Sequence, residues 1–95
     1  MKILHVVALI HASTGGPALS VTRLAREQAK AGHEVALACL DYPDLGPQIE
    51  ASGVRVVARK GDWLAVRGRG WSPALRSAVV EEARRVDVVH NHGLW

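Results

Sequence analysis

The sequence predicts an α/β fold: a Rossmann-like open parallel sheet of about four strands with three helices. Short apolar runs alternate along the chain with amphipathic segments, which is the pattern of successive βα units. Val, Ala and Leu dominate the composition and Phe is absent, which suits buried parallel strands better than a β-sandwich. The chain has 95 residues, enough for one such unit, and no linker-like stretch divides it.

The first half of the chain predicts two strands and the helix between them. The apolar run Ile3–Ile10 is interrupted only by His5, as expected of a central strand covered on both faces. A turn-rich loop over residues 11–17 follows it. Apolar residues at helical spacing then predict a helix over Pro17–Ala31, and the next apolar run predicts a strand over Glu34–Leu40.

The second half predicts two more strands and two more helices. A short helix is expected over Pro47–Ser52, followed by a strand over Val54–Ala58. The segment 60–71 is rich in Gly and Trp and is expected to be irregular. Ser72-Pro73 is a strong helix start, because Ser caps exposed amides and Pro loses no hydrogen bond there. That helix should run to Arg85, and Val86–His90 should be the last strand.

Right-handed crossovers place the first strand in the centre, the second and third on one side of it and the fourth on the other. The order reverses between the first and fourth strands, so a ligand crevice is expected beyond their carboxyl ends. The loops bordering it are residues 11–16 and 90–93. Gly15 and Gly16 precede a helix, where backbone amides can approach an anion. A tight turn that merely leads into the helix is an equal alternative.

Histidines are the other candidate site residues. His92 follows the last strand beside Gly93, and it is the best candidate for a hydrogen-bond donor or proton carrier, with a surface loop histidine as the alternative. His90 is expected to end the strand as a partly buried, hydrogen-bonded imidazole. A metal site is not expected, because no His/Cys/Glu spacing supports one and His5 or His11 would have to converge on the pair.

Charge and cysteine content narrow the partners and the compartment. The chain carries a formal charge of +3, and its basic residues cluster between positions 55 and 76. They are Arg55, Arg59, Lys60, Arg67, Arg69 and Arg76. A solvated face explains them best, attraction to phosphates or to an anionic membrane surface is the alternative, and no motif indicates nucleic acid. The single cysteine, Cys39, lies in an apolar strand and permits no internal disulfide, which agrees with a cytoplasmic protein. Peripheral attachment at the inner membrane face is the alternative expectation for its location.

Five segments, taken in order, resemble a known family. They are Met1–Val7, Gly15-Gly16-Pro17, Ala31–Val35, Ser72–Arg76 and Asp87–Trp95. Together they resemble the N-terminal, acceptor-side part of a retaining, family-four glycosyltransferase with the GT-B fold. Such enzymes assemble bacterial surface polysaccharides and glycolipids.

The resemblance implies roles for individual residues. It puts Gly15 and Gly16 beside the phosphates of a nucleotide-sugar donor, and His92 near the transferred sugar as the catalytic residue. Asn91 and Gly93 would add substrate contacts. The nucleotide-sugar would be a co-substrate, the acceptor would be a glycan or a lipid-linked glycan, and no cofactor or metal is implied.

The resemblance also sets the expected domain organisation. Residues 1–95 would be the N-terminal portion of the acceptor-side domain, without the donor-binding C-terminal domain, and the chain would be inactive alone. Two alternatives remain: a small non-catalytic α/β module that binds a phosphorylated ligand at Gly15-Gly16, and one half of a split transferase. The uncovered apolar strand Val86–His90 should favour self-association.

Overall fold

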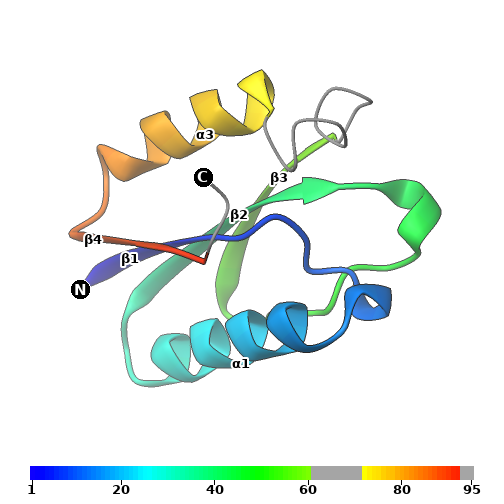
Figure 1. Cartoon of the computed structure of the whole chain (residues 1–95). Helices are drawn as coiled ribbons and strands as arrows, with labels where there is room; N and C mark the ends of the chain where they lie inside the picture. The colour runs from blue at the N-terminus through cyan, green and yellow to red at the C-terminus, as the bar shows by residue number, and fades with distance from the viewer. Residues whose placement is uncertain (61–71, 93–95) are drawn as a thin grey trace.

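The computed structural model describes residues 1–60 and 72–92 of the chain. These residues form a four-stranded, all-parallel sheet with one α-helix on each face (Figure 1). Its strands are β1 (Lys2–Val6), β2 (Glu34–Asp41), β3 (Val54–Lys60) and β4 (Val88–Asn91). The helices of the described part are α1 (Gly16–Lys30), α3 (Pro73–Ala83) and two short 3-10 turns, η1 (Ala12–Thr14) and η2 (Pro43–Leu45). The predicted α/β, Rossmann-like class is confirmed.

The strand order is β3-β2-β1-β4, as the crossover rule predicts. The chain places β2 and then β3 on one side of β1, and β4 on the other side. The strand order therefore reverses between β1 and β4. In the register of that pair, His5 lies opposite His90 and Val6 opposite Asn91. The two segments expected to border a crevice therefore leave the same end of neighbouring strands.

The core has two layers, one on each side of the sheet. Side chains alternate along β2, so this strand contributes to both layers. The layer under α3 contains Leu4, Val6, Ala36, Ala38, Leu40 and Leu75. The layer under α1 contains Val7, Ile10, Val21, Ala25, Val35, Leu37 and Cys39. Cys39 is fully buried, as predicted, and burial raises the pKa of its thiol to about 12.

The short helix predicted over Pro47–Ser52 is wrong, so the described part of the chain has two α-helices instead of three. The backbone of this segment bonds to the loop after β1: Ile49 N donates to the Ile10 carbonyl at 2.8 Å, and the Pro47 carbonyl accepts from Ala12 N. Gln48 forms an isolated antiparallel bridge with His11. So short a helix is marginal by itself, and these tertiary bonds replace it.

Several strand boundaries also differ from the prediction, among them the end of β1 and the start of β4. β1 ends at Val6 rather than Ile10. Val7 and Ile10 are buried all the same, so the apolar run continues past the end of the strand because these residues belong to the core. β4 begins at Val88 rather than Val86, after Asp87 N donates to the Lys2 carbonyl at 2.8 Å. The start of α3 is as predicted: the Ser72 hydroxyl accepts from Leu75 N at 3.2 Å. Within residues 1–60 and 72–92, no helix has the length and apolar character needed to cross a membrane.

Candidate functional site

Three histidines meet where β1 and β4 pair, on the face of the sheet that carries α1. His5 lies opposite His90 in the register, and His92 follows two positions later on the same side. The ring centroids are 5.5 Å apart for His5 and His90, 5.1 Å for His5 and His92, and 4.1 Å for His90 and His92. His92 stays aligned with the sheet because its backbone N donates to the Val6 carbonyl at 2.8 Å. We call these three residues the histidine cluster.

A chain of hydrogen bonds orients the cluster. His5 Nε2 lies 2.6 Å from Gln28 Oε1 on α1, and His5 Nδ1 lies 2.9 Å from His92 Nε2. An amide oxygen only accepts, so His5 carries its proton on Nε2 and its Nδ1 accepts from His92 Nε2. This assignment leaves Nδ1 as the acceptor nitrogen of a neutral His92.

The cluster passes from the core to the surface. His5 is fully buried, His92 is half-buried and His90 is exposed. The prediction of a partly buried His90 is therefore wrong, because no segment of the described residues covers this position on the edge strand β4. Burial lowers the pKa of His5, with a bond to Gln28 opposing it and the charge of His90 adding to it. Burial, then the charges of His90 and His5, also lower the pKa of His92, so both rings favour the neutral form.

Gly15 and Gly16 stand at the amino end of α1 and are exposed. Gly15 has φ +86° and ψ −145°, a conformation that needs glycine, whereas Gly16 opens the helix without a positive φ. A Cβ on either residue would meet nothing within 4 Å. Gly16 precedes Gln28 by twelve residues, so the glycines lie roughly 18 Å along the helix axis from the Gln28–His5 contact. The His92 ring lies 5.1 Å from the His5 ring, so it shortens that separation by at most this distance.

Asn91 and Gly93 are the other two predicted site residues. Asn91 pairs with Val6 inside β4, and strand alternation points it to the face opposite the histidine cluster. Gly93 lies outside the described residues. The structure thus groups His92 with His5 and His90 instead of with Asn91.

His11, in the loop expected to border the crevice, is a structural residue. It is fully buried, Nδ1 donates to the Gly46 carbonyl at 2.8 Å, and Nε2 accepts from Tyr42 N at 3.0 Å. Both ring nitrogens are therefore used to join the loop after β1 to the loop after β2. This explains why His5, and not His11, meets the His90–His92 pair.

Gln28 has no role in the sequence-based prediction of the site, and His5 enters it only as a residue that a metal site would have to recruit. The signal for both was present. His5 is the one polar residue in the run Ile3–Ile10, and Gln28 interrupts the apolar stripe of α1. Polar side chains at buried positions need partners, and here each is the other's partner.

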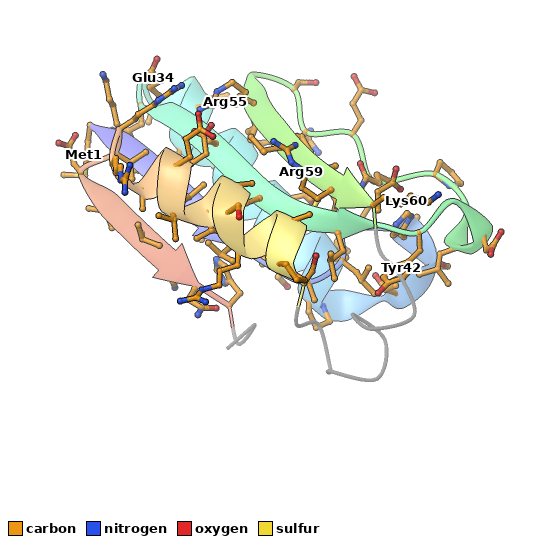
Figure 2. The ribbon with its side chains drawn as sticks, turned by 90° about the horizontal axis from the view of Figure 1, so that it is seen from above. Met1, Glu34, Tyr42, Arg55, Arg59 and Lys60 are labelled. Atoms are coloured by element: carbon orange, nitrogen blue, oxygen red, sulfur yellow. The ribbon has the colours of Figure 1, made fainter. Side chains whose placement is uncertain are left out.

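The basic residues on β3 follow one another along an outer strand (Figure 2). Arg55 forms a bidentate pair with Glu82 of α3, in which Nη1 lies 2.8 Å from Oε1. The Arg59 guanidinium donates to the Ala58 carbonyl at 2.9 Å. Arg67 and Arg69 lie outside the described residues. Binding to an anionic membrane surface stays a prediction, and Arg55 already has a partner within the fold.

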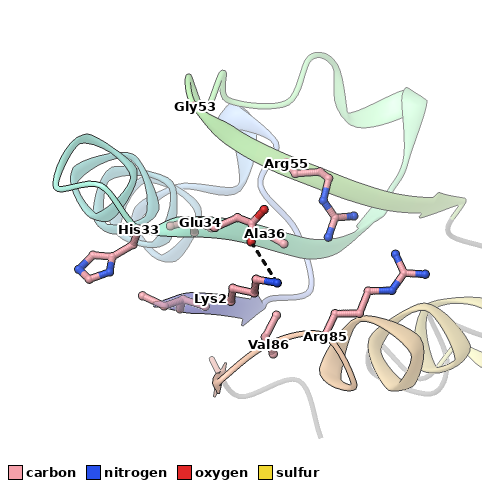
Figure 3. Close-up of a pocket in the computed structure, with 10 residues that line it drawn as sticks. Lys2, His33, Glu34, Ala36, Gly53, Arg55, Arg85 and Val86 are labelled. Atoms are coloured by element: carbon pink, nitrogen blue, oxygen red, sulfur yellow. Dashed lines mark ion pairs between the residues drawn. The ribbon is translucent and has the colours of Figure 1, made fainter.

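One pocket lies at the amino ends of the strands, opposite the end where the crevice is expected (Figure 3). Lys2, Arg55 and Arg85 line it together with Glu34. Lys2 Nζ lies 3.9 Å from Glu34 Oε2, and Arg55 is paired with Glu82. These ion pairs offset much of the positive charge, so the pocket does not compete with the histidine cluster as a candidate site.

Comparison with known proteins is informative at the level of the family. The model of Glycosyltransferase Family 4 matches residues 14–95, which include Gly15, Gly16 and the whole of β4. No curated protein and no solved structure matches the chain. The match covers far more than half of the sequence and agrees with the parallel α/β sheet. The chain belongs to glycosyltransferase family 4.

Proposed function

We propose that this chain forms the acceptor-side part of a retaining GT-B glycosyltransferase, which moves a sugar from a nucleotide-sugar to a polysaccharide or glycolipid acceptor. The observation that carries the proposal is the family match over residues 14–95. The matched range includes the start of α1 and the end of β4, which border the place where the strand order reverses. Ligands of open parallel sheets bind outside such a reversal.

In this proposal the exposed amino end of α1 binds the donor phosphates. The first backbone amides of a helix have no partner inside it, and the helix dipole favours negative charge there. Gly15 and Gly16 bring no side chain that would obstruct a phosphate. Negative charge grows on the leaving phosphate during transfer, and these amides would stabilise it.

His92 would contact the transferred sugar. The hydrogen-bond chain from Gln28 through His5 fixes the His92 ring, so Nδ1 accepts a hydrogen bond from a sugar hydroxyl. This sharpens the sequence-based expectation of a donor, because the neutral His92 already uses its proton toward His5. His5 and Gln28 act as positioning residues.

The test is a titration of the isotope-labelled chain with uridine and guanosine diphosphate sugars, followed by NMR. We expect weak binding, with shifts at the Gly15 and Gly16 amides and at the His92 ring. The sugar-free nucleoside diphosphates should shift the glycine amides alone. His92→Ala should abolish the difference between sugar-bearing and sugar-free ligands, while His33→Ala, in the turn before β2, should keep it.

Other outcomes would overturn the proposal in defined ways. Equal binding of diphosphates with and without sugar in the unmodified chain would favour a non-catalytic phosphate-binding module. Tight binding, or sugar transfer by the chain alone, would contradict the expectation that it supplies only one side of the site. Shifts confined to the amino ends of the strands would place the ligand in the pocket beside Lys2 and Arg55.

A further inference from the structure

We propose that His5, His90 and His92 bind a divalent transition-metal ion of the zinc type. Each histidine offers one ring nitrogen, and these atoms all lie within 4.8 Å of one another. Imidazole nitrogen is a preferred ligand of zinc, copper and nickel ions. The inference does not depend on the proposed function, because it rests on the geometry of the cluster and needs no sugar nucleotide.

The spacing fits a tetrahedral ion after small side-chain movements. With zinc–nitrogen bonds of about 2.0–2.1 Å, neighbouring ligand nitrogens are about 3.3 Å apart. His5 Nδ1 and His92 Nε2 are 2.9 Å apart and must open slightly, whereas ligand atoms up to 4.8 Å apart must close. His92 is half-buried and His90 is exposed, so both rings have room to adjust around the fixed, fully buried His5.

The protonation pattern also suits an ion. Gln28 Oε1 holds the proton of His5 on Nε2, so the Nδ1 lone pair already points at the cluster. Such an outer partner is typical of metal-bound histidines, where it fixes the tautomer and the ring orientation. His92 would bind through Nε2 after its proton moves to Nδ1, with no net loss of protons. That change would turn the outward Nδ1 from an acceptor into a donor.

The exposed side of the cluster leaves room for a fourth ligand. His90 is exposed, so solvent can reach an ion held by the three rings. Three protein ligands with water in the fourth position are the usual composition of an open zinc site. The ion would also tie β4 to β1 and, through His5 and Gln28, to α1.

The experiment uses the full chain without an affinity tag, titrated with Co²⁺ and then with Zn²⁺. We expect one equivalent of Co²⁺ to give the visible absorption of a four- or five-coordinate ion, and Zn²⁺ to displace it. His90→Ala should weaken Co²⁺ binding at least tenfold, and Gln28→Ala about tenfold or more, since loss of an outer partner costs about 10–100-fold. Zn²⁺ should raise the unfolding temperature of the unmodified chain and not of His90→Ala.

The matched control is His33→Ala, which also removes one histidine but lies in the turn between α1 and β2. It should leave Co²⁺ affinity unchanged. Equal affinity in the unmodified chain and in His90→Ala would overturn the proposal, as would equal losses in His90→Ala and His33→Ala. One ion for every two chains would indicate an ion held between molecules and would also overturn it. Because His90 is exposed, its removal should leave the circular dichroism spectrum unchanged, which separates lost ligation from lost folding.

Discussion

The two edge strands of the sheet, β3 and β4, expose different kinds of side chains. β3 carries Arg55, Arg59 and Lys60, and a carboxylate on α3 holds the first of these in a bidentate pair. β4 is short, and all four of its residues are exposed, with Val88 at 42% and Val89 at 46%. Charged residues are the usual protection of an edge strand against pairing with other chains. β4 instead presents Val88, Val89, His90 of the histidine cluster, and Asn91.

Because of this difference, we expect substitutions on the two edges to affect different properties of the chain. The β3 edge is joined to α3 by a buried carboxylate, so changes there should act mainly on folding. On the β4 edge the side chains bury little area, so changes there should act mainly on what the chain binds. The candidate site thus lies on the edge that contributes less to the fold.

The largest expected effect on folding is that of Arg55→Ala. Glu82 is 7% exposed and would lose the cation that bonds both of its oxygens. A buried carboxylate without its partner costs more than the pair contributes, so we expect the free energy of unfolding to fall by about 2 kcal/mol. Urea denaturation followed by circular dichroism measures it. Arg59→Ala, on the same strand, should change it by less than about 0.5 kcal/mol. Equal effects would contradict a special role for the Arg55–Glu82 pair.

The same pair predicts a dependence on pH. The bond to Arg55, with the nearby positive charges, lowers the pKa of Glu82 below its ordinary value of 4.5. A lowered carboxyl pKa stabilises the fold fully above that ordinary value, and the contribution is lost as the pH falls through the lower, folded value. The gap in stability between the unmodified chain and Arg55→Ala should therefore be constant near neutral pH and shrink below pH 4.5. A gap that widens on acidification would contradict this sign.

How much of this the sequence predicts differs between the edges. Strand order follows from the crossover rule, and the starts of α1 and α3 follow from local signals, such as Gly15-Gly16-Pro17 and the Ser72 cap. The meeting of the three histidines does not, because His5 and His92 are 87 positions apart and meet only through the β1–β4 register. The helix predicted over Pro47–Ser52 fails for the same reason: bonds to Ile10 and Ala12 decide its backbone. Long-range pairings carry no periodic signal.

A smaller effect is expected from giving β4 the charge that β3 has. Val88→Lys with Val89→Lys should weaken self-association of the chain at least tenfold, or about 1.4 kcal/mol, because lysines on an edge oppose strand pairing. Sedimentation over a range of concentrations measures it. Val56→Lys on β3, where Val56 is 37% exposed, is the control and should leave association unchanged. A chain that is monomeric before any substitution would contradict self-association through β4.

The smallest expected effect is that of His90→Ala on the stability of the metal-free chain. His90 is exposed, so it contributes no favourable burial. Its charge lowers the pKa of His5 and His92, so it does not stabilise their charged forms either. We expect the free energy of unfolding to change by less than about 0.5 kcal/mol at neutral pH in the presence of a chelator. A loss near that of Arg55→Ala would mean that the cluster stabilises the fold without an ion. A small change in stability, together with a large loss of Co²⁺ affinity, would show that His90 acts in ligand binding. That result would support the expected difference between the two edges, in which β3 affects folding and β4 affects binding.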